Sequence, residues 1–244
     1  MTFPDDIAFG FVPSQPNANR YENVSEDPSD VAMLIAGCLR RNARVLDIGC
    51  GTGSTAFVYQ KHSGCVVFGV EPDPDRAATA RSRGLEVITG FYSEEIAKKQ
   101  GPFDAIVFAD VIEHIGNGAN LLAEARKALK PDGVIIVSLP NIAHLTMRLN
   151  LLFGKFNYEP TGIMDATHLR WFTLSSAQKW FRNLGFDVTH AGSTTNATLP
   201  AYYRRPWKYV PLRVRRALLR PGVKMLPGLF GCQHIFVLKS PVAL

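Results

Sequence analysis

Short apolar runs alternate with helix-like stretches through the first 140 residues, and this alternation restricts the fold more than any other feature. Five runs have the apolar pattern of buried strands: 43–49, 65–71, 85–90, 103–110 and 134–140. The stretches expected as helices are 29–41, a segment beginning near residue 54, 74–82 and 120–129, and a turn is expected at 130–133. Apolar strands separated by helices are typical of a parallel sheet covered on both faces. The chain is therefore predicted to be an α/β protein.

The pattern changes after Pro140. Residues 142–153 have helical spacing, Thr173 is expected to cap a helix over 174–184, and two further strands are expected at 186–191 and 234–240. These strands bring the predicted sheet to seven. The expected parts are an irregular arm at 1–28, a core at 29–191 with a substrate cover at about 142–172, a basic insertion at 192–232 and the last strand of the core at 233–244.

Basic residues gather near the end of the chain. Nine of the 27 Lys and Arg residues lie after residue 200, where there is no Asp or Glu, and the rest of the chain has 18 basic and 21 acidic side chains. An acidic body argues against nucleic-acid binding, and the basic end indicates a local contact with something anionic. A helix is expected there from Pro211 to Pro221. Three partners stay open for this segment: an anionic membrane surface met by 201–225, an anionic substrate such as a lipid-linked diphosphate sugar, or a dimer face.

Signals for export or membrane insertion are not apparent. No run of 18 or more apolar residues occurs, and the opening MTFPDDIAFG has acids where a signal peptide has Lys or Arg. The four cysteines make no CxxC pair, so neither a disulfide framework nor a metal site is expected. We expect a cytoplasmic location, at the inner membrane surface if the basic segment binds lipid.

A glycine-rich turn follows the first apolar run. It reads Asp47-Ile-Gly49-Cys50-Gly51-Thr-Gly53, and a helix is expected to begin directly after it. Glycines at this place let a ligand approach the backbone closely, and the next helix presents its N-terminus there. The spacing is GxGxG, whereas the dinucleotide fingerprint is GxGxxG. The turn therefore predicts a ligand other than a dinucleotide pyrophosphate.

This turn and three later motifs resemble those of the class I methyltransferases that use S-adenosylmethionine. The similar stretches are VLDIGCGTG, the second run ending in Glu71, FDAIVFADVIEHI, and LLAEARKALKPDGVIIVSLPN. They cover about 44–141 in the order of that family. The resemblance implies a Rossmann-like, seven-stranded mixed sheet that is mostly parallel, with helices on both faces and S-adenosylmethionine as cofactor. The alternative is a Rossmann-like domain that binds another nucleotide or none.

The resemblance also implies roles for individual residues. Asp47 would hold the glycine loop and the methionine amino end, and Glu71, followed by Pro72, would accept the ribose hydroxyls. Many relatives have an acid after the third strand to meet the adenine, whereas this chain has Phe91 and Tyr92, with Ser93 or a backbone group left for the hydrogen bond. The full set expected to bind the cofactor is Asp47, Gly49, Cys50, Gly51, Glu71, Pro72, Phe91, Tyr92, Asp110, Val111 and His114.

A second signature lies beyond the cofactor motifs, in GIMDATHLRWFT over 162–173. It resembles a subgroup of these enzymes that is often found in bacterial glycan and polysaccharide biosynthesis. His168 is expected to act as a general base oriented by Asp165. The alternative is a purely structural role, with Asp165 paired to Arg170 and His168 in an interior hydrogen bond. Trp171 and Phe172 are expected to pack on the core.

Three residues are expected to contact the acceptor, namely Asn141, His144 and Arg170. Asn141 and His144 follow the fifth run, at the carboxyl edge where ligands bind in such sheets. For Asn141, the alternative is a cap on the next helix. Arg170 is open to a structural role.

The function implied is methyl transfer to a hydroxyl of a sugar, a glycan or a lipid-linked glycan precursor. Because the leaving group of a sulfonium is neutral, no metal is needed to activate it, and holding the acceptor in line supplies much of the rate. Two alternatives stay open. One is N- or O-methylation of a small secondary metabolite or quinone-like compound, and the other is a cofactor-binding partner protein without catalysis. The oligomeric state is not predicted.

Overall fold

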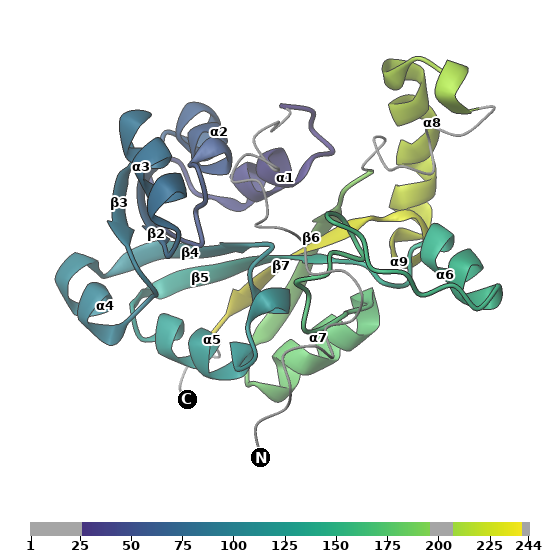
Figure 1. The fold of residues 1–244 in the computed structure, drawn as a ribbon. Coiled ribbons are helices and arrows are strands. Elements are labelled where there is room, and N and C mark those ends of the chain that lie inside the picture. Colours follow the sequence, from purple (N-terminus) through teal and green to yellow (C-terminus); the bar gives the residue numbers. More distant parts are fainter. Residues whose placement is uncertain (1–25, 196–206, 241–244) are drawn as a thin grey trace.

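A seven-stranded sheet forms the centre of the protein (Figure 1). The computed structural model describes residues 26–195 and 207–240. The strands lie in the order β3-β2-β1-β4-β5-β7-β6, and β7 is antiparallel to both β5 and β6. Their bounds are β1 Arg44–Ile48, β2 Val66–Glu71, β3 Glu86–Thr89, β4 Phe103–Ala109, β5 Leu129–Pro140, β6 Asp187–Ser193 and β7 Gln233–Lys239. The predicted seven-stranded, mostly parallel sheet is confirmed.

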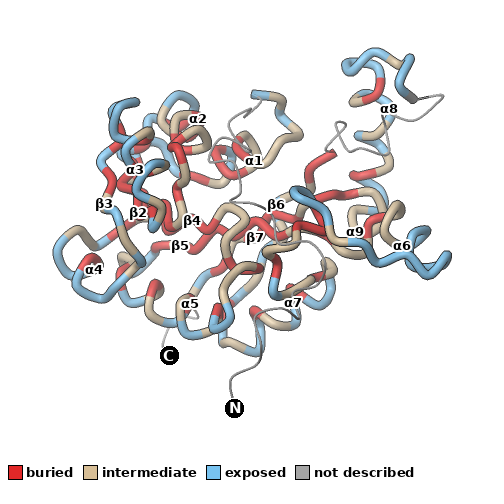
Figure 2. Tube along the Cα trace, viewed as in Figure 1, coloured by how far each residue is buried: buried red, intermediate tan, exposed pale blue. Residues whose placement is uncertain are grey.

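Side chains that alternate along the strands build one apolar cluster on each face of the sheet. On β4, Ile106 and Phe108 join the cluster beneath α4, α5 and α7, whereas Ala105 and Val107 join the cluster beneath α1, α2 and α3. Figure 2 shows the buried strands between these two helix layers. Because successive side chains of a strand point to opposite faces, both faces need apolar residues, which explains the continuous apolar runs.

The helices begin where polar caps occur in the sequence. Asp73 accepts hydrogen bonds from the amides of Asp75 and Arg76, and Thr173 forms a capping box with Ser176. The helices over the two faces are α1 Val31–Cys38, α2 Ser54–Ser63, α3 Pro74–Ser82, α4 Glu94–Gln100, α5 Gly118–Arg126 and α7 Leu174–Asn183. Those beyond the sheet are α6 Leu145–Leu152, α8 Leu212–Met225 and α9 Pro227–Phe230, with short 3₁₀ turns η1 Ile112–His114 and η3 Trp207–Tyr209.

Two local expectations are wrong. The turn expected at 130–133 lies inside β5, where a register shift between Phe103 and Ala105 accommodates it. The helix expected to end at Pro221 is α8, which continues to Met225 with the proline inside it. Packing explains the continuation, because Val223 beyond the proline is buried and Gly222 lies against Phe230 of α9.

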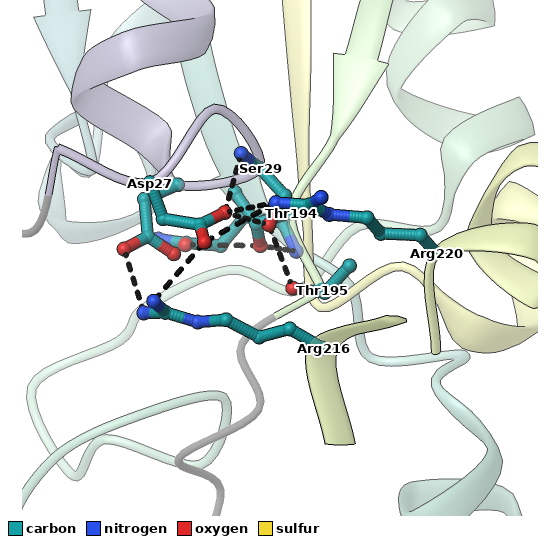
Figure 3. A network of polar contacts seen from close by, with 8 residues as sticks. Asp27, Ser29, Thr194, Thr195, Arg216 and Arg220 are labelled. Atoms are coloured by element: carbon teal, nitrogen blue, oxygen red, sulfur yellow. Dashed lines mark hydrogen bonds and ion pairs between the residues drawn. The ribbon is translucent and has the colours of Figure 1, made fainter. Parts of the chain in front are cut away.

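The basic helix α8 projects from the end of the sheet, as Figure 1 shows, and ion pairs tie it to the segment before α1. Arg216 and Arg220 each approach Asp27 to 3.0 Å, and Arg216 also approaches Asp30 to 3.5 Å. Figure 3 shows this network beside Ser29 and Thr195, whose hydroxyls are 3.0 Å apart. Part of the basic charge is therefore balanced within the chain.

Some expected features lie outside the described residues. These are residues 1–25 of the arm, 196–206 of the insertion and 241–244 at the end. Within the described ranges, no helix combines the length and the apolar character that crossing a bilayer requires.

Candidate functional site

The glycine loop lies at the carboxyl end of β1 and approaches β2 and β4. Gly49 and Gly51 have φ values of 73° and 56°, which favour glycine. The amide of Gly49 donates to the carbonyl of Val70 at 2.7 Å. A Cβ on Gly49 would come within 2.7 Å of Val111, whereas one on Gly51 would meet no described atom within 4 Å. The loop is therefore packed on one side and open at Gly51.

Two buried carboxylates lie under this loop, and we call them the Asp47–Glu71 centre. Glu71 accepts hydrogen bonds from the amides of Gly51 at 2.8 Å and Asp73 at 3.0 Å. Asp47 is 1% exposed, and its Oδ1 has no hydrogen-bond partner among the described residues. Burial, with the nearby charge of Glu71, raises the pKa of Asp47 to about 8. A buried carboxyl oxygen that lacks a hydrogen-bond donor is satisfied when a ligand brings a cationic or hydrogen-donating group to it.

Asp110 directly follows β4 and has a backbone φ of 55°, which is uncommon outside glycine. Its carboxylate accepts from Ser138 at 2.7 Å and from Gln233 of β7 at 2.6 Å. Burial raises the pKa of Asp110, and these two hydrogen bonds oppose the rise. Such a held conformation at the carboxyl edge of a sheet is typical of a functional position.

A second group of polar side chains lies just after β4, and we call it the Glu113–His114–His168 cluster. One candidate ligand atom from each residue lies within 4.8 Å of the other two. The imidazole rings of His114 and His168 are edge-to-face, with centroids 4.7 Å apart. Glu113 is 1% exposed, and neither carboxylate oxygen has a hydrogen-bond partner among the described residues. Burial raises the pKa of Glu113 well above its usual range, with the charge of Asp110 adding to the rise.

Backbone hydrogen bonds fasten the segment 162–173 against η1 and the end of β5. The amides of Leu169 and Arg170 both donate to the carbonyl of Glu113, at 2.9 and 3.2 Å. The amide of Ile142 donates to the carbonyl of Phe172 at 3.0 Å. This docking brings His168 to Glu113 and His114, which are far from it along the chain.

The predicted pair in this segment is buried, and each member has a defined local partner. Asp165 accepts from the amide and hydroxyl of Thr167, at 2.9 and 2.6 Å. Nδ1 of His168 lies 3.2 Å from the carbonyl of Ile163. The guanidinium of Arg170 donates to the carbonyl of Gly116. Arg170 therefore holds the loop after η1, and the roles of Asp165 and His168 in catalysis stay predictions.

The aromatic residues of the segment differ in their surroundings. Phe172 is buried in the core cluster beneath α4, α5 and α7, as expected. Trp171 is half-buried and packs against Phe156 and Tyr158, with ring centroids 5.8 and 6.0 Å away. Trp171 therefore joins the segment to the loop before it rather than to the sheet.

Asn141 and His144 have structural partners instead of facing an open space. The side-chain Nδ2 of Asn141 donates to the carbonyls of Gly231 and Gly228, at 2.8 and 3.2 Å, and its Oδ1 accepts from the backbone amide of Ala143. The expectation that Asn141 caps the next helix is wrong, because Nδ1 of His144 accepts from the amide of Thr146 and caps α6. Both side chains are 1% exposed or less. Nε2 of His144 has no hydrogen-bond partner among the described residues, and a contact of either residue with the acceptor stays a prediction.

The residues expected near the adenine point in different directions. Phe91 is 78% exposed, and the hydroxyl of Tyr92 donates to the carbonyl of Glu124 in α5. Ser93 caps α4 through the amide of Ile96. Among these three, Phe91 offers an apolar face to a ligand, and its contact with adenine stays a prediction.

Known proteins are similar to this chain in sequence and in fold. Residues 21–191 match the family described as Methyltransferase domain, which is well over half of the chain. The chain belongs to the methyltransferase domain family. Its fold is similar to that of a SAM-dependent methyltransferase from Archaeoglobus fulgidus, with a TM-score of 0.53 and 22% identity over 85% of this chain and 94% of that one. At that identity the likeness concerns the fold.

Curated relatives carry different printed activities. The Ubiquinone biosynthesis O-methyltransferase of Azorhizobium caulinodans is 31% identical over 106 residues, 41% of this chain and 42% of that protein. The Cyclopropane-fatty-acyl-phospholipid synthase of Escherichia coli K12 is 26% identical over 171 residues, 68% of this chain and 43% of that protein. The chain thus spans less than half the length of these relatives.

Several contributing residues escape prediction from the sequence. Ser138 and Gln233 hold Asp110, and Gly69 makes room for Cys50, since a Cβ on Gly69 would lie 2.6 Å from the Cys50 sulfur. Glu113 is the largest omission. Its signal is an acid beside a histidine directly after a buried strand, in VIEHI.

Proposed function

We propose that this chain transfers a methyl group from S-adenosylmethionine to a hydroxyl oxygen of an acceptor. The observation that carries the proposal is the Asp47–Glu71 centre beneath an open glycine loop. Asp47 has an unmet buried acceptor atom, and the space above Gly51 is clear of described atoms. Family membership supports the same activity.

The residues around the loop fit the methyl donor. Asp47 would receive its amino group, because a carboxylate in a dry site gains most from a cationic partner. Glu71 holds the loop through Gly51 and keeps lone pairs for ribose hydroxyls. Asp110 and Val111, at the end of β4, would flank the methionyl part, and Cys50 and Pro72 would line the loop. His114 would lie toward the reacting end.

The chemistry requires little from the protein besides position. S-adenosylmethionine supplies a methyl group on a sulfonium, whose leaving group is neutral. The chain holds the acceptor oxygen in line with that group and excludes water. A hydroxyl also has to lose its proton, and we assign this part of the reaction to the segment that carries Asp165 and His168. Nε2 of His168 either takes the proton itself or binds a cation that acidifies the acceptor.

For the acceptor we propose a sugar hydroxyl of a glycan or lipid-linked glycan precursor. The signature of 162–173 supports a glycan, and the surface beside it supports a lipid tail. No residue of α6 is buried, and Leu152 and Phe153 at its C-terminal end are 76% and 73% exposed. The second candidate is a phenolic hydroxyl of a quinone-like compound, which the Azorhizobium relative favours.

We also propose that α8 meets an anionic membrane surface. Val214 and Leu218 of α8 are 48% and 59% exposed beside the exposed Arg213. Apolar and cationic residues on one projecting helix suit the interface of an anionic bilayer. Co-sedimentation with vesicles containing anionic lipid tests this contact, and Leu218→Ser with Val214→Ser is expected to release the protein. Equal binding to neutral vesicles would contradict it.

The methyl-transfer proposal is tested by following S-adenosylhomocysteine formation by mass spectrometry. The purified chain is incubated with S-adenosylmethionine and either a polyprenyl-diphosphate glycan fraction or a polyprenyl catechol. We expect turnover with the glycan fraction above a reaction without acceptor. Turnover with the catechol but not with the glycan fraction would replace the proposed glycan acceptor by a phenolic one. Donor binding without turnover in either fraction, or in whole-cell extract, would favour a cofactor-binding partner protein.

A further inference from the structure

We propose that the Glu113–His114–His168 cluster binds a divalent transition-metal cation that holds the acceptor oxygen. The cluster lies immediately after β4, at the edge of the sheet that carries the glycine loop. The inference rests on the proposed methyl transfer for its role in the reaction, whereas the binding of the cation can be tested without it.

The spacing of the three side chains suits a single cation. Their candidate ligand atoms all lie within 4.8 Å of one another. A cation bonded to nitrogen and carboxylate oxygen at about 2.1 Å has neighbouring ligand atoms roughly 3.4 Å apart when they are arranged tetrahedrally. The cluster would contract from a spacing of at most 4.8 Å to this one when it binds the cation.

Hydrogen bonds to the backbone orient both imidazoles for this task. Nδ1 of His114 is 3.2 Å from the carbonyl of Thr167, and Nδ1 of His168 is 3.2 Å from the carbonyl of Ile163. A carbonyl only accepts, so each ring places an N–H at Nδ1, and in the neutral tautomer this leaves the lone pair on Nε2. Imidazoles that bind metals in proteins are commonly held in this way, with the second nitrogen donating to a backbone carbonyl.

The carboxylate of Glu113 adds an independent indication. Glu113 is 1% exposed, and both of its oxygens are without a hydrogen-bond partner among the described residues. A buried carboxyl group in that state costs free energy that a bound cation offsets. The carbonyl of the same residue accepts from Leu169 and Arg170, which fixes it against the segment that supplies His168.

Two imidazole nitrogens and one carboxylate oxygen select the class of cation. This set suits zinc, manganese, cobalt or iron better than magnesium or calcium, which prefer oxygen ligands throughout. Three protein ligands leave coordination positions open for a substrate oxygen. His114 is half-buried, so the cluster is not sealed from solvent.

The cation would act on the acceptor rather than on the leaving group. An oxygen bound to it loses its proton to solvent more easily. The oxygen lone pair then forms the bond to the methyl carbon, and the electron pair of the breaking carbon–sulfur bond passes to sulfur. In this arrangement His168 is a ligand, and the proton goes to water instead of its ring.

The experiment measures cation binding to the full chain. Protein stripped with a chelator is titrated calorimetrically with Zn²⁺ and separately with Mn²⁺, and bound metal is counted by mass spectrometry after dialysis. We expect one cation per chain. Because even residues that only orient a ligand contribute about 10–100-fold, Glu113→Gln and His168→Gln are each expected to weaken binding at least about 100-fold. The matched controls Glu95→Gln and His62→Gln, on the surface, are expected to bind as the unchanged chain does.

Two results would overturn the proposal: no stoichiometric binding of either cation by the unchanged chain, or full-affinity binding by Glu113→Gln. Cooperative thermal unfolding of each variant, followed by circular dichroism, shows that it is folded. If the unchanged chain binds the cation but does not bind S-adenosylhomocysteine, the result would contradict the proposed function and leave the cation site standing. If methyl transfer persists in the presence of chelator but is absent in His168→Gln, the cation has no part in the reaction and the His168 imidazole acts as the base.

Discussion

The Asp47–Glu71 centre and the Glu113–His114–His168 cluster lie at the same edge of the sheet but are built differently. The first consists of strand ends and the turn between them, and Glu71 is bonded directly to the amide of Gly51. The second depends on residues 162–173 folding back onto η1 through the carbonyl of Glu113. Donor binding should therefore depend on the sheet and its glycine loop, and acceptor chemistry should depend on the docking of segment 162–173.

The largest expected effect concerns the glycine loop. Gly51→Val places a branched side chain in the open space above the loop, at a φ of 56° that costs such a residue about 1–2 kcal/mol. We expect calorimetry to show up to about a 100-fold loss of S-adenosylhomocysteine affinity, because a side chain that fills a binding site costs about 1–3 kcal/mol and every 1.4 kcal/mol is tenfold in affinity.

The matched control for that change is Gly185→Val. Gly185 also has positive φ, and a Cβ on it would meet no described atom within 4 Å, but it lies after α7, on the face of the sheet opposite α2 and the loop that precedes it. The variant should share the backbone strain and keep the donor affinity. An unchanged affinity in Gly51→Val would contradict the assignment of the donor site.

A smaller and more selective effect is expected from Thr167→Val. The hydroxyl of Thr167 donates to Asp165 at 2.6 Å and lies 3.1 Å from Nδ1 of His114. Its loss leaves a buried carboxylate with one hydrogen bond fewer, at a cost of about 1–3 kcal/mol. We expect methyl transfer to fall by about tenfold or more while donor affinity changes less than about twofold. Thr79→Val, on the surface of α3, is the control, and equal loss of both quantities would remove the distinction between the two regions.

The pH dependence of donor binding sharpens the comparison further. Burial and Glu71 raise the pKa of Asp47 to about 8, so the free chain holds this carboxyl protonated at neutral pH. A cationic amino group binds the ionised form, so binding at pH 7 releases a proton. Affinity should rise by up to about tenfold per pH unit from pH 6 and level off above pH 8.

Calorimetry in buffers of different ionisation enthalpy measures that proton. The release is expected to disappear in Asp47→Asn, and to persist in Thr167→Val because the second region is separate. Affinity that is flat between pH 6 and 8 would contradict the contact between Asp47 and the donor.

The smallest effect is expected from the contacts of α8. Asp27 pairs with Arg216 and Arg220. Burial alone would raise the pKa of Asp27, but its hydrogen bonds with Ser29 and Arg220 lower the pKa below its usual value. Asp27→Asn should lower the free energy of unfolding by about 1 kcal/mol, measured with urea, without altering donor affinity. Arg213→Gln, on the exposed side of α8, should change neither. A loss of donor affinity in Asp27→Asn would contradict this expectation and show that the contacts of α8 affect the donor site.

The sheet and the glycine loop were predictable because their signals are local. Continuous apolar runs mark strands buried on both faces, and the GxGxG turn follows the first of them directly. Helix α4 was missed because its seven residues contain a single buried side chain, Ile96, which sets no periodicity. The continuation of α8 through Pro221 depends on packing against α9, which no local pattern records.

The second region was predictable only in part. The signature at 162–173 singles out Asp165 and His168, but nothing in it indicates that His168 meets Glu113 and His114. That meeting follows from two backbone hydrogen bonds to the Glu113 carbonyl, which are contacts between distant segments. Likewise, Asn141 and His144 stand at the expected edge, yet both are buried, Asn141 through a contact with the distant Gly231 and His144 through a local contact with Thr146.

The most direct measurement compares donor affinity and methyl transfer in one variant, His168→Gln. S-adenosylhomocysteine binding is measured by calorimetry, and turnover is measured with the acceptor fraction that supports the unchanged chain. If donor and acceptor functions are divided between the two regions, affinity should stay within about twofold while turnover falls at least about 100-fold, since the chemical step loses either a ligand or a base. A variant that keeps full turnover, or that loses donor affinity to the same degree, would contradict this division.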